Sequence, residues 1–269
     1  MLEMKVLAIG DPHGSLEKVK AIPIKNVDLI LLTGDLGKAD LARKRSFENT
    51  KRKQQGLPKV KDTAQERREI HNEIHKSTLD ILRYLSKYAP VYAIQGNVGI
   101  PSVSQVREDY EKYGIKLTST KEQVDRMSDV SIVKNGLRVL NGLRVGFLEY
   151  FIDTSWVREF KPKDYQKSMR KAKKQTEKAR GVLRRFGNDL DILICHQPPF
   201  GFLDKVNFPG APEHWQGKKA GSKAILEYIK SHQPKYVFCG HIHEGEGMKR
   251  IGKTEVYNLG VGGYKLVEL

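Results

Sequence analysis

The sequence has only two cysteines, Cys195 and Cys239, among its 269 residues, which excludes a disulfide framework. Its longest run of large aliphatic residues, at 29–32, is far shorter than the roughly 20 apolar residues that cross a bilayer. The first eleven residues lack the basic head and long apolar stretch of a signal peptide. We therefore expect a cytoplasmic protein that does not associate with membranes.

Positive charge is abundant but unevenly placed, because two stretches hold most of the net charge of +16. Residues 38–76 carry 12 basic and six acidic side chains, and residues 157–185 carry 12 and three. The rest of the chain is close to neutral. We therefore expect one domain over 1–269 with basic helical insertions at 38–76 and 150–188, which would form a lid or a side lobe and attract polyanions.

Five short apolar runs, each rich in aliphatic residues and closed by glycine or a polar residue, predict buried strands. They lie at 6–9, 27–32, 91–94, 192–195 and 236–239. Apolar runs without alternation indicate strands covered on both faces, as in α/β proteins. The sequence thus predicts a layered α/β fold.

Three further segments have readable patterns. Asn135-Gly136 and Asn141-Gly142 predict a small antiparallel meander over 130–149. The runs at 254–259 and 264–267 predict a C-terminal strand pair. The second insertion predicts a basic amphipathic helix, because its apolar residues recur at helical spacing. These residues are Met169, Ala172, Thr176, Ala179, Val182, Leu183 and Phe186.

Each of the five predicted strands is followed within three residues by a side chain able to bind a metal. At any one strand, an ordinary turn residue is the simpler interpretation. However, four of the eight histidines fall at these strand ends, where turn chemistry does not require imidazole. Strands that share a direction bring their carboxyl ends to one edge. The candidate metal ligands are Asp11, His13, Asp35, Asn97, His196, His241 and His243.

The order Asp-x-His, Gly-Asp, Gly-Asn, His and Gly-His-x-His resembles the calcineurin-like metallophosphoesterase superfamily. The segment 196–201 and the segment 240–245 look like its phosphodiesterase-type branch. This resemblance implies an α/β fold that is a four-layer αββα sandwich of two mixed sheets flanked by helices. It also implies two metal ions at one rim of the sandwich.

Carried across by the resemblance, Asp11, His13 and His243 would hold one metal and Asn97, His196 and His241 the other, with Asp35 bridging both. Two divalent ions held close together need a shared anionic ligand to offset their repulsion. Mixed imidazole and carboxylate ligands suit Mn, Fe, Zn or Ni. Asp35 and Asn97 are therefore candidate catalytic residues as well.

The third block departs from the family's Gly-Asn-His-Asp pattern, because it reads Gly96-Asn97-Val98-Gly99. Val98 cannot protonate a leaving group, so either another group does so or the substrate leaves easily. His214 is the candidate substitute acid, and the alternative is an ordinary exposed loop histidine.

Three more residues are candidate substrate-binding residues, each with a structural alternative. Phe200 and Trp215 could stack against a flat leaving group or simply anchor their loop. Ser222 begins a predicted helix, where its backbone could bind phosphate or its side chain could cap the helix.

The sequence predicts a dinuclear metal-dependent phosphoesterase, and specifically a phosphodiesterase that acts on a small phosphodiester. Three alternatives stay open: a nuclease, a phosphomonoesterase, and a non-catalytic module that uses metal as a clasp and binds nucleic acid or a protein partner. The basic insertions could bind nucleic acid or form solvated helix faces. The sequence leaves the oligomeric state and the identity of the metals open.

Overall fold

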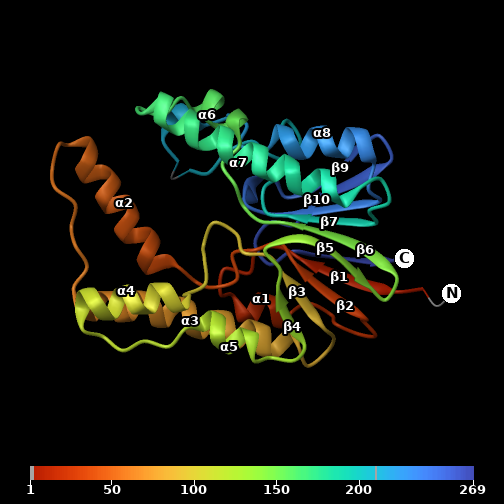
Figure 1. Ribbon diagram of the computed structural model, residues 1–269, viewed down its shortest axis with the longest axis horizontal. Helices are drawn as coiled ribbons and strands as arrows, with labels where there is room; N and C mark the ends of the chain where they lie inside the picture. The colour runs from red at the N-terminus through yellow and green to blue at the C-terminus, as the bar shows by residue number, and fades with distance from the viewer. Residues whose placement is uncertain (1–2, 210) are drawn as a thin grey trace.

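The computed structural model describes residues 3–209 and 211–269, which form two β-sheets packed face to face with helices outside both (Figure 1). The first sheet has the strand order β11-β1-β2-β3-β4. Its strands are β1 (Lys5–Ile9), β2 (Leu29–Leu32), β3 (Val91–Ala93), β4 (Val130–Ile132) and β11 (Tyr264–Glu268). Strands β1 to β4 are parallel, and β11 runs antiparallel to β1 at the edge.

The second sheet has the order β5-β6-β7-β8-β10-β9, with a parallel centre and an antiparallel strand at each edge. Its strands are β5 (Asn135–Leu140), β6 (Leu143–Leu148), β7 (Ile192–Cys195), β8 (Tyr236–Cys239), β9 (Gly247–Ile251) and β10 (Thr254–Asn258). All five buried strands predicted from apolar runs are confirmed. They divide between the two sheets, with β1, β2 and β3 in one and β7 and β8 in the other.

Three apolar layers hold the sandwich together. Val6, Leu31, Phe147 and Phe238 belong to the layer between the sheets, and all four are fully buried. Helices α1 (Leu16–Lys20), α3 (Ala64–Leu85) and α5 (Thr120–Asp125) cover the first sheet through a second layer. Helices α7 (Tyr165–Phe186) and α8 (Lys223–His232) cover the other sheet through the third. The predicted four-layer αββα sandwich of two mixed sheets is confirmed.

The predicted apolar stripe of α7 is confirmed in full, since all seven of its residues are buried. The remaining helices of the insertions are α2 (Asp40–Gln54) and α6 (Thr154–Phe160), while α4 (Val103–Tyr113) lies along α3 (Figure 1). Two short 3-10 helices lie at Glu213–Trp215 and His243–Gly245. Among residues 3–209 and 211–269, no helix combines the length and apolar character that crossing a membrane requires.

Two predicted strand pairings are wrong. The segment 130–149 is not one meander, because β4 joins the first sheet while β5 and β6 form a hairpin in the second. Asn141-Gly142 makes that hairpin turn with φ of 50° and 91°, as the preferred two-residue turn requires. Likewise, β10 and β11 do not pair with each other, because they lie in different sheets. The local patterns located these strands but did not specify their partners.

Candidate metal centre

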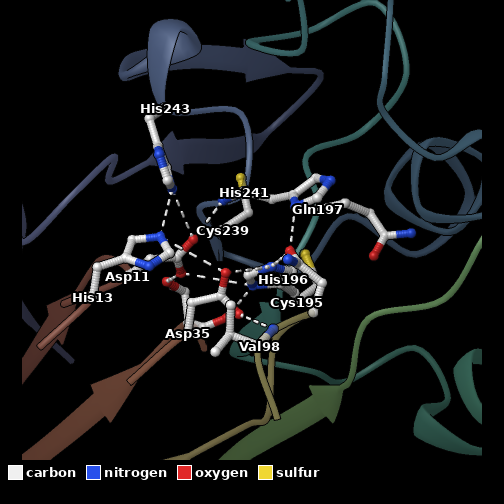
Figure 2. A network of polar contacts seen from close by, with 12 residues as sticks. Asp11, His13, Asp35, Val98, Cys195, His196, Gln197, Cys239, His241 and His243 are labelled. Atoms are coloured by element: carbon white, nitrogen blue, oxygen red, sulfur yellow. Dashed lines mark hydrogen bonds and ion pairs between the residues drawn. The ribbon is translucent and has the colours of Figure 1, made fainter. Parts of the chain in front are cut away.

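Seven side chains meet where the carboxyl ends of the central strands from both sheets come together (Figure 2). The loops after β1, β2 and β3 contribute four of them, and those after β7 and β8 contribute three. These are the seven predicted ligands Asp11, His13, Asp35, Asn97, His196, His241 and His243. The geometry therefore brings together residues that are up to 232 positions apart in the sequence.

One group of ligand atoms comes from Asp11, His13 and His243, whose nitrogen and oxygen atoms lie within 4.8 Å of one another. The Nε2 atoms of His13 and His243 are 3.3 Å apart and face each other, as Figure 2 shows. Asp11 Oδ2 lies 3.3 Å from His243 Nε2 and also accepts a hydrogen bond from the backbone N–H of His241 at 2.6 Å. These three side chains can hold one cation.

The second group centres on His196, whose environment contains a mismatch that a cation would resolve. His196 Nδ1 lies 3.0 Å from the backbone carbonyl of Thr33, which can only accept, so Nδ1 carries the proton. In the neutral imidazole, Nε2 is then an acceptor, yet it lies 2.9 Å from another acceptor, Asn97 Oδ1. His241 Nδ1 reaches the same Asn97 oxygen at 2.8 Å. This cluster of lone pairs fits a metal ion.

Asp35 lies between the two groups. Its Oδ2 atom is 3.7 Å from His13 Nε2 in the first group and 3.7 Å from His196 Nε2 in the second. Its other oxygen accepts a hydrogen bond from the backbone N–H of Val98 at 2.7 Å. One oxygen is thus fixed by the protein, while the other faces both candidate metal positions.

The backbone around these ligands is strained and closely packed. His13, Asp35 and His241 have φ of 46°, 39° and 65°, a left-handed conformation that few residues other than glycine adopt. Gly240 passes so close to Asp11 that an added Cβ would lie 2.5 Å from the carboxylate carbon. A Cβ on Gly96 would likewise overlap Asp35. The fold therefore maintains unfavourable local geometry in order to place these side chains.

Electrostatics favour the protonation states that bind metal. Burial raises the pKa of Asp11, but His196 and the hydrogen bonds to the carboxylate outweigh burial and hold the pKa below its ordinary value. Burial lowers the pKa of His13. Burial, together with the nearby His196, lowers the pKa of His241 to about 3. Ionised carboxylates and neutral imidazoles are the forms that coordinate metal ions.

Two residues of the site were missed by the sequence reasoning. Thr33 is fully buried, and its hydroxyl donates to Asp11 Oδ1 at 2.6 Å while its carbonyl orients His196. Tyr150, just beyond β6, packs its ring against His196 and His241, with centroid separations of 5.7 and 5.1 Å. A polar residue two positions before Asp35 was the available signal for Thr33. Tyr150 could have been found by its position two residues after β6, since the other site residues also follow the ends of strands.

The contacts of the four other predicted site residues lie away from the candidate metal ligands. Ser222 is fully buried, donates to Asp153 Oδ2 at 2.6 Å and accepts from Ile225 N at the start of α8, so its hydroxyl caps that helix. Trp215 packs against Trp156 and Phe160 of α6. These contacts match the structural alternatives, capping and loop anchoring.

The remaining two lie at the surface of the loop between β7 and α8. Phe200 is partly buried beneath the ammonium groups of Lys219 and Lys223, which lie 5.4 and 5.0 Å from its ring centroid. His214 is exposed in the 3-10 helix Glu213–Trp215. The predicted role of His214 as substitute acid stays a prediction.

Comparison with known proteins decides the family. A family model described as calcineurin-like phosphoesterase matches residues 4–245, which include all seven ligand candidates. The chain belongs to the calcineurin-like phosphoesterase family. Members of this family are dinuclear metal-dependent, and the structure brings together two candidate ligand groups, one of Asp11, His13 and His243 and one of Asp11, Asp35 and His196.

Curated relatives of this calcineurin-like phosphoesterase match over a short segment. A UPF0046 protein of Caenorhabditis elegans is 35% identical over 71 residues, which cover 26% of this chain and 21% of that protein. The human metallophosphoesterase domain-containing protein 1 is 40% identical over 73 residues, or 27% of this chain and 20% of its own. The matched segment thus spans about a fifth of each relative.

Solved structures match over nearly the whole chain at low identity. A phosphopantetheinyl hydrolase from Mycobacterium tuberculosis superposes with a TM-score of 0.54 and 15% identity, covering 97% of this chain and 90% of its own. Identity at this level shows a shared fold alone.

Proposed function

We propose that the protein is a dinuclear metal-dependent phosphodiesterase. The observation that carries this proposal is the position of Asp35 Oδ2, 3.7 Å from one imidazole of each ligand group. When bound, two divalent ions would activate water and neutralise charge on the phosphoryl group. We infer that Asp11, His13 and His243 hold one ion, that Asn97, His196 and His241 hold the other, and that Asp35 binds both.

The charge of the site suits a phosphodiester. Two divalent ions with two carboxylates and one hydroxide carry a formal charge of about +1, which complements the single negative charge of a diester. Val98 cannot donate a proton from its side chain, and its backbone N–H is occupied by Asp35. Substrates with good leaving groups are therefore favoured over poor ones. The metals we expect are Mn, Fe, Zn or Ni.

The chain's own residues orient the reacting groups. Thr33 fixes the His196 ring and one Asp11 oxygen, so the metal-facing atoms of both are aimed before any ion binds. The Val98 N–H holds Asp35 in its bridging orientation. This preorganisation lowers the cost of assembling the site around substrate.

The test is hydrolysis of bis(p-nitrophenyl) phosphate with added Mn²⁺. Asp35→Asn keeps the shape of the side chain but removes the shared negative charge, so we expect kcat/KM to fall by about 10³-fold or more. The variant should also retain fewer metal ions per chain, measured by elemental analysis after dialysis. Asp129→Asn, an exposed change before β4, is the matched control. Hydrolysis indifferent to both chelator and Asp35→Asn would overturn the proposal.

A non-catalytic metal clasp is the second candidate, and it is favoured by Val98 and Gly99, which stand where the family pattern has histidine and aspartate. It predicts two bound ions per chain without turnover of any ester. Val98→His separates the candidates, since a gain of turnover would show an active site limited by its missing acid.

A further inference from the structure

A cavity of about 350 Å³ lies beside the metal centre, between α7 and the segment that follows β6. We propose that this cavity, the α7 subsite, binds the leaving alcohol of a phosphodiester when that alcohol carries an anionic group of its own. Lys171 and Lys178 would hold that anion. The proposal rests on the proposed phosphodiesterase function and names its substrate class.

Tyr150 connects the cavity to the metal centre. It is one of the residues that line the cavity, and its ring packs against His196 and His241, at centroid separations of 5.7 and 5.1 Å. The candidate metal ligands and the α7 subsite are therefore both in contact with Tyr150. In this proposal, a leaving group attached to phosphorus at the metal centre extends past Tyr150 into the cavity.

The register of α7 places its polar side chains on the cavity side. Lys171 and Lys178 are seven residues apart, which puts them on the same helix face two turns apart. Gln175 lies between them on that face and accepts a hydrogen bond from the backbone N–H of Ile152 at 2.7 Å. This bond fixes the helix against the segment after β6. Ala179 and Val182 are the apolar residues that α7 contributes to the lining.

The two lysines are available to a ligand. Among the ion pairs of residues 3–209 and 211–269, none involves Lys171 or Lys178, whereas their neighbour Arg180 is paired with both Glu177 and Glu227. Both lysines are exposed, so they border the opening of the cavity to solvent.

Glu149 is the acidic group of the lining, and it is half-buried. Burial raises the pKa of its carboxyl group, while Lys134 and Lys178 oppose that shift. The lining therefore carries more positive than negative charge. Such a cavity selects an anionic group, and the carboxyl beside it can bind a hydroxyl on the same leaving alcohol.

The experiment compares the dinucleotide TpT with its phosphorylated forms pTpT and TpTp, with Mn²⁺ present. Whichever alcohol leaves, one of the phosphorylated forms places the extra charge on it. We expect kcat/KM for that form to exceed the value for TpT by about tenfold. In K171Q/K178Q, the ratio of kcat/KM for that phosphorylated form to kcat/KM for TpT should fall to about one. K173Q/R184Q is the matched control, because it removes two exposed basic side chains from a different face of α7.

A binding measurement separates the subsite from the chemistry. Calorimetric titration of chelator-treated protein with thymidine 3′,5′-bisphosphate should give weaker binding in K171Q/K178Q than in K173Q/R184Q. Three results would overturn the subsite. All three dinucleotides could react alike, or both double variants could lose the preference for the added phosphate equally. The third is that this preference appears only with long oligonucleotides. No turnover of bis(p-nitrophenyl) phosphate by the unsubstituted protein would instead overturn the phosphodiesterase proposal.

Discussion

The two basic insertion helices both carry net positive charge, +4 in α2 and +8 in α7, yet the fold holds them in different ways. Helix α7 buries an apolar stripe against the second sheet, and Leu183 within it is 2% exposed. Helix α2 has no buried residue among those whose side chains are described, and its Phe47 is 58% exposed. It stands apart from the sandwich in Figure 1. Apolar spacing, and not charge, therefore decides whether such a helix becomes part of the core.

The largest expected effect comes from replacing one apolar side chain in each helix by alanine, which tests whether α7 and α2 differ in packing. Leu183→Ala should destabilise the protein by about 2–5 kcal/mol, because it leaves a cavity between α7 and the second sheet. Phe47→Ala should change the free energy of unfolding by no more than about 0.5 kcal/mol, because the ring is already exposed. Urea unfolding followed by circular dichroism measures both. A loss of comparable size for Phe47→Ala would show that α2 is docked in solution.

The contrast also shows what the sequence can predict. Periodicity identified every buried residue of α7, and the same criterion, applied to α2, finds no stripe. Short apolar runs located the strands, and the residues after them supplied the metal-ligand candidates. Those predictions depend on local patterns, and a local pattern is what a sequence displays directly.

Features that depend on contacts between distant segments were not predictable in this way. The partners of β4 and β11 are chosen by the packing of whole sheets, so both strands were paired wrongly. Thr33 and Tyr150 act through contacts with histidines from other strands, and only their positions just after a strand mark them in the sequence. The α7 subsite likewise exists only because α7 lies across the end of β6.

A second prediction concerns how the stability of the protein depends on pH through α3, the helix to which α2 is attached. His71 of α3 is 4% exposed and stacks on His75, near the ion pair of Arg67 with Asp109 of α4. Burial lowers the pKa of His71, so the unfolded chain binds a proton that the folded chain resists. The stability that this histidine contributes is complete above a pH of about 6.5 and decreases as the pH falls below it.

Urea unfolding at pH 8 and pH 5.5 measures this effect. His71→Asn should lose less stability between the two pH values than the unsubstituted protein does, although His75, whose pKa burial also lowers, retains part of the dependence. His214→Asn, an exposed histidine far along the chain, is the control and should keep the original pH dependence. An unchanged dependence in His71→Asn would assign the effect to other groups.

The smallest expected effect is confined to α2 and concerns its polar attachment. Arg45 pairs with Asp62 at 2.8 Å, with Glu48 at 3.0 Å and with Glu66 of α3, so a few charged contacts take the place of an apolar stripe. Arg45→Met removes these contacts without disturbing the core. Backbone amides of α2 should then exchange hydrogen several-fold faster, while those of α7 and the melting temperature stay unchanged. Lys44→Met removes a neighbouring exposed charge and should leave α2 as it is. If the amides of α2 exchange at the same rate in both variants, the ion pairs of Arg45 do not stabilise this helix, and its own backbone hydrogen bonds do. Helix α2 would then differ from α7 only in its exposure to solvent.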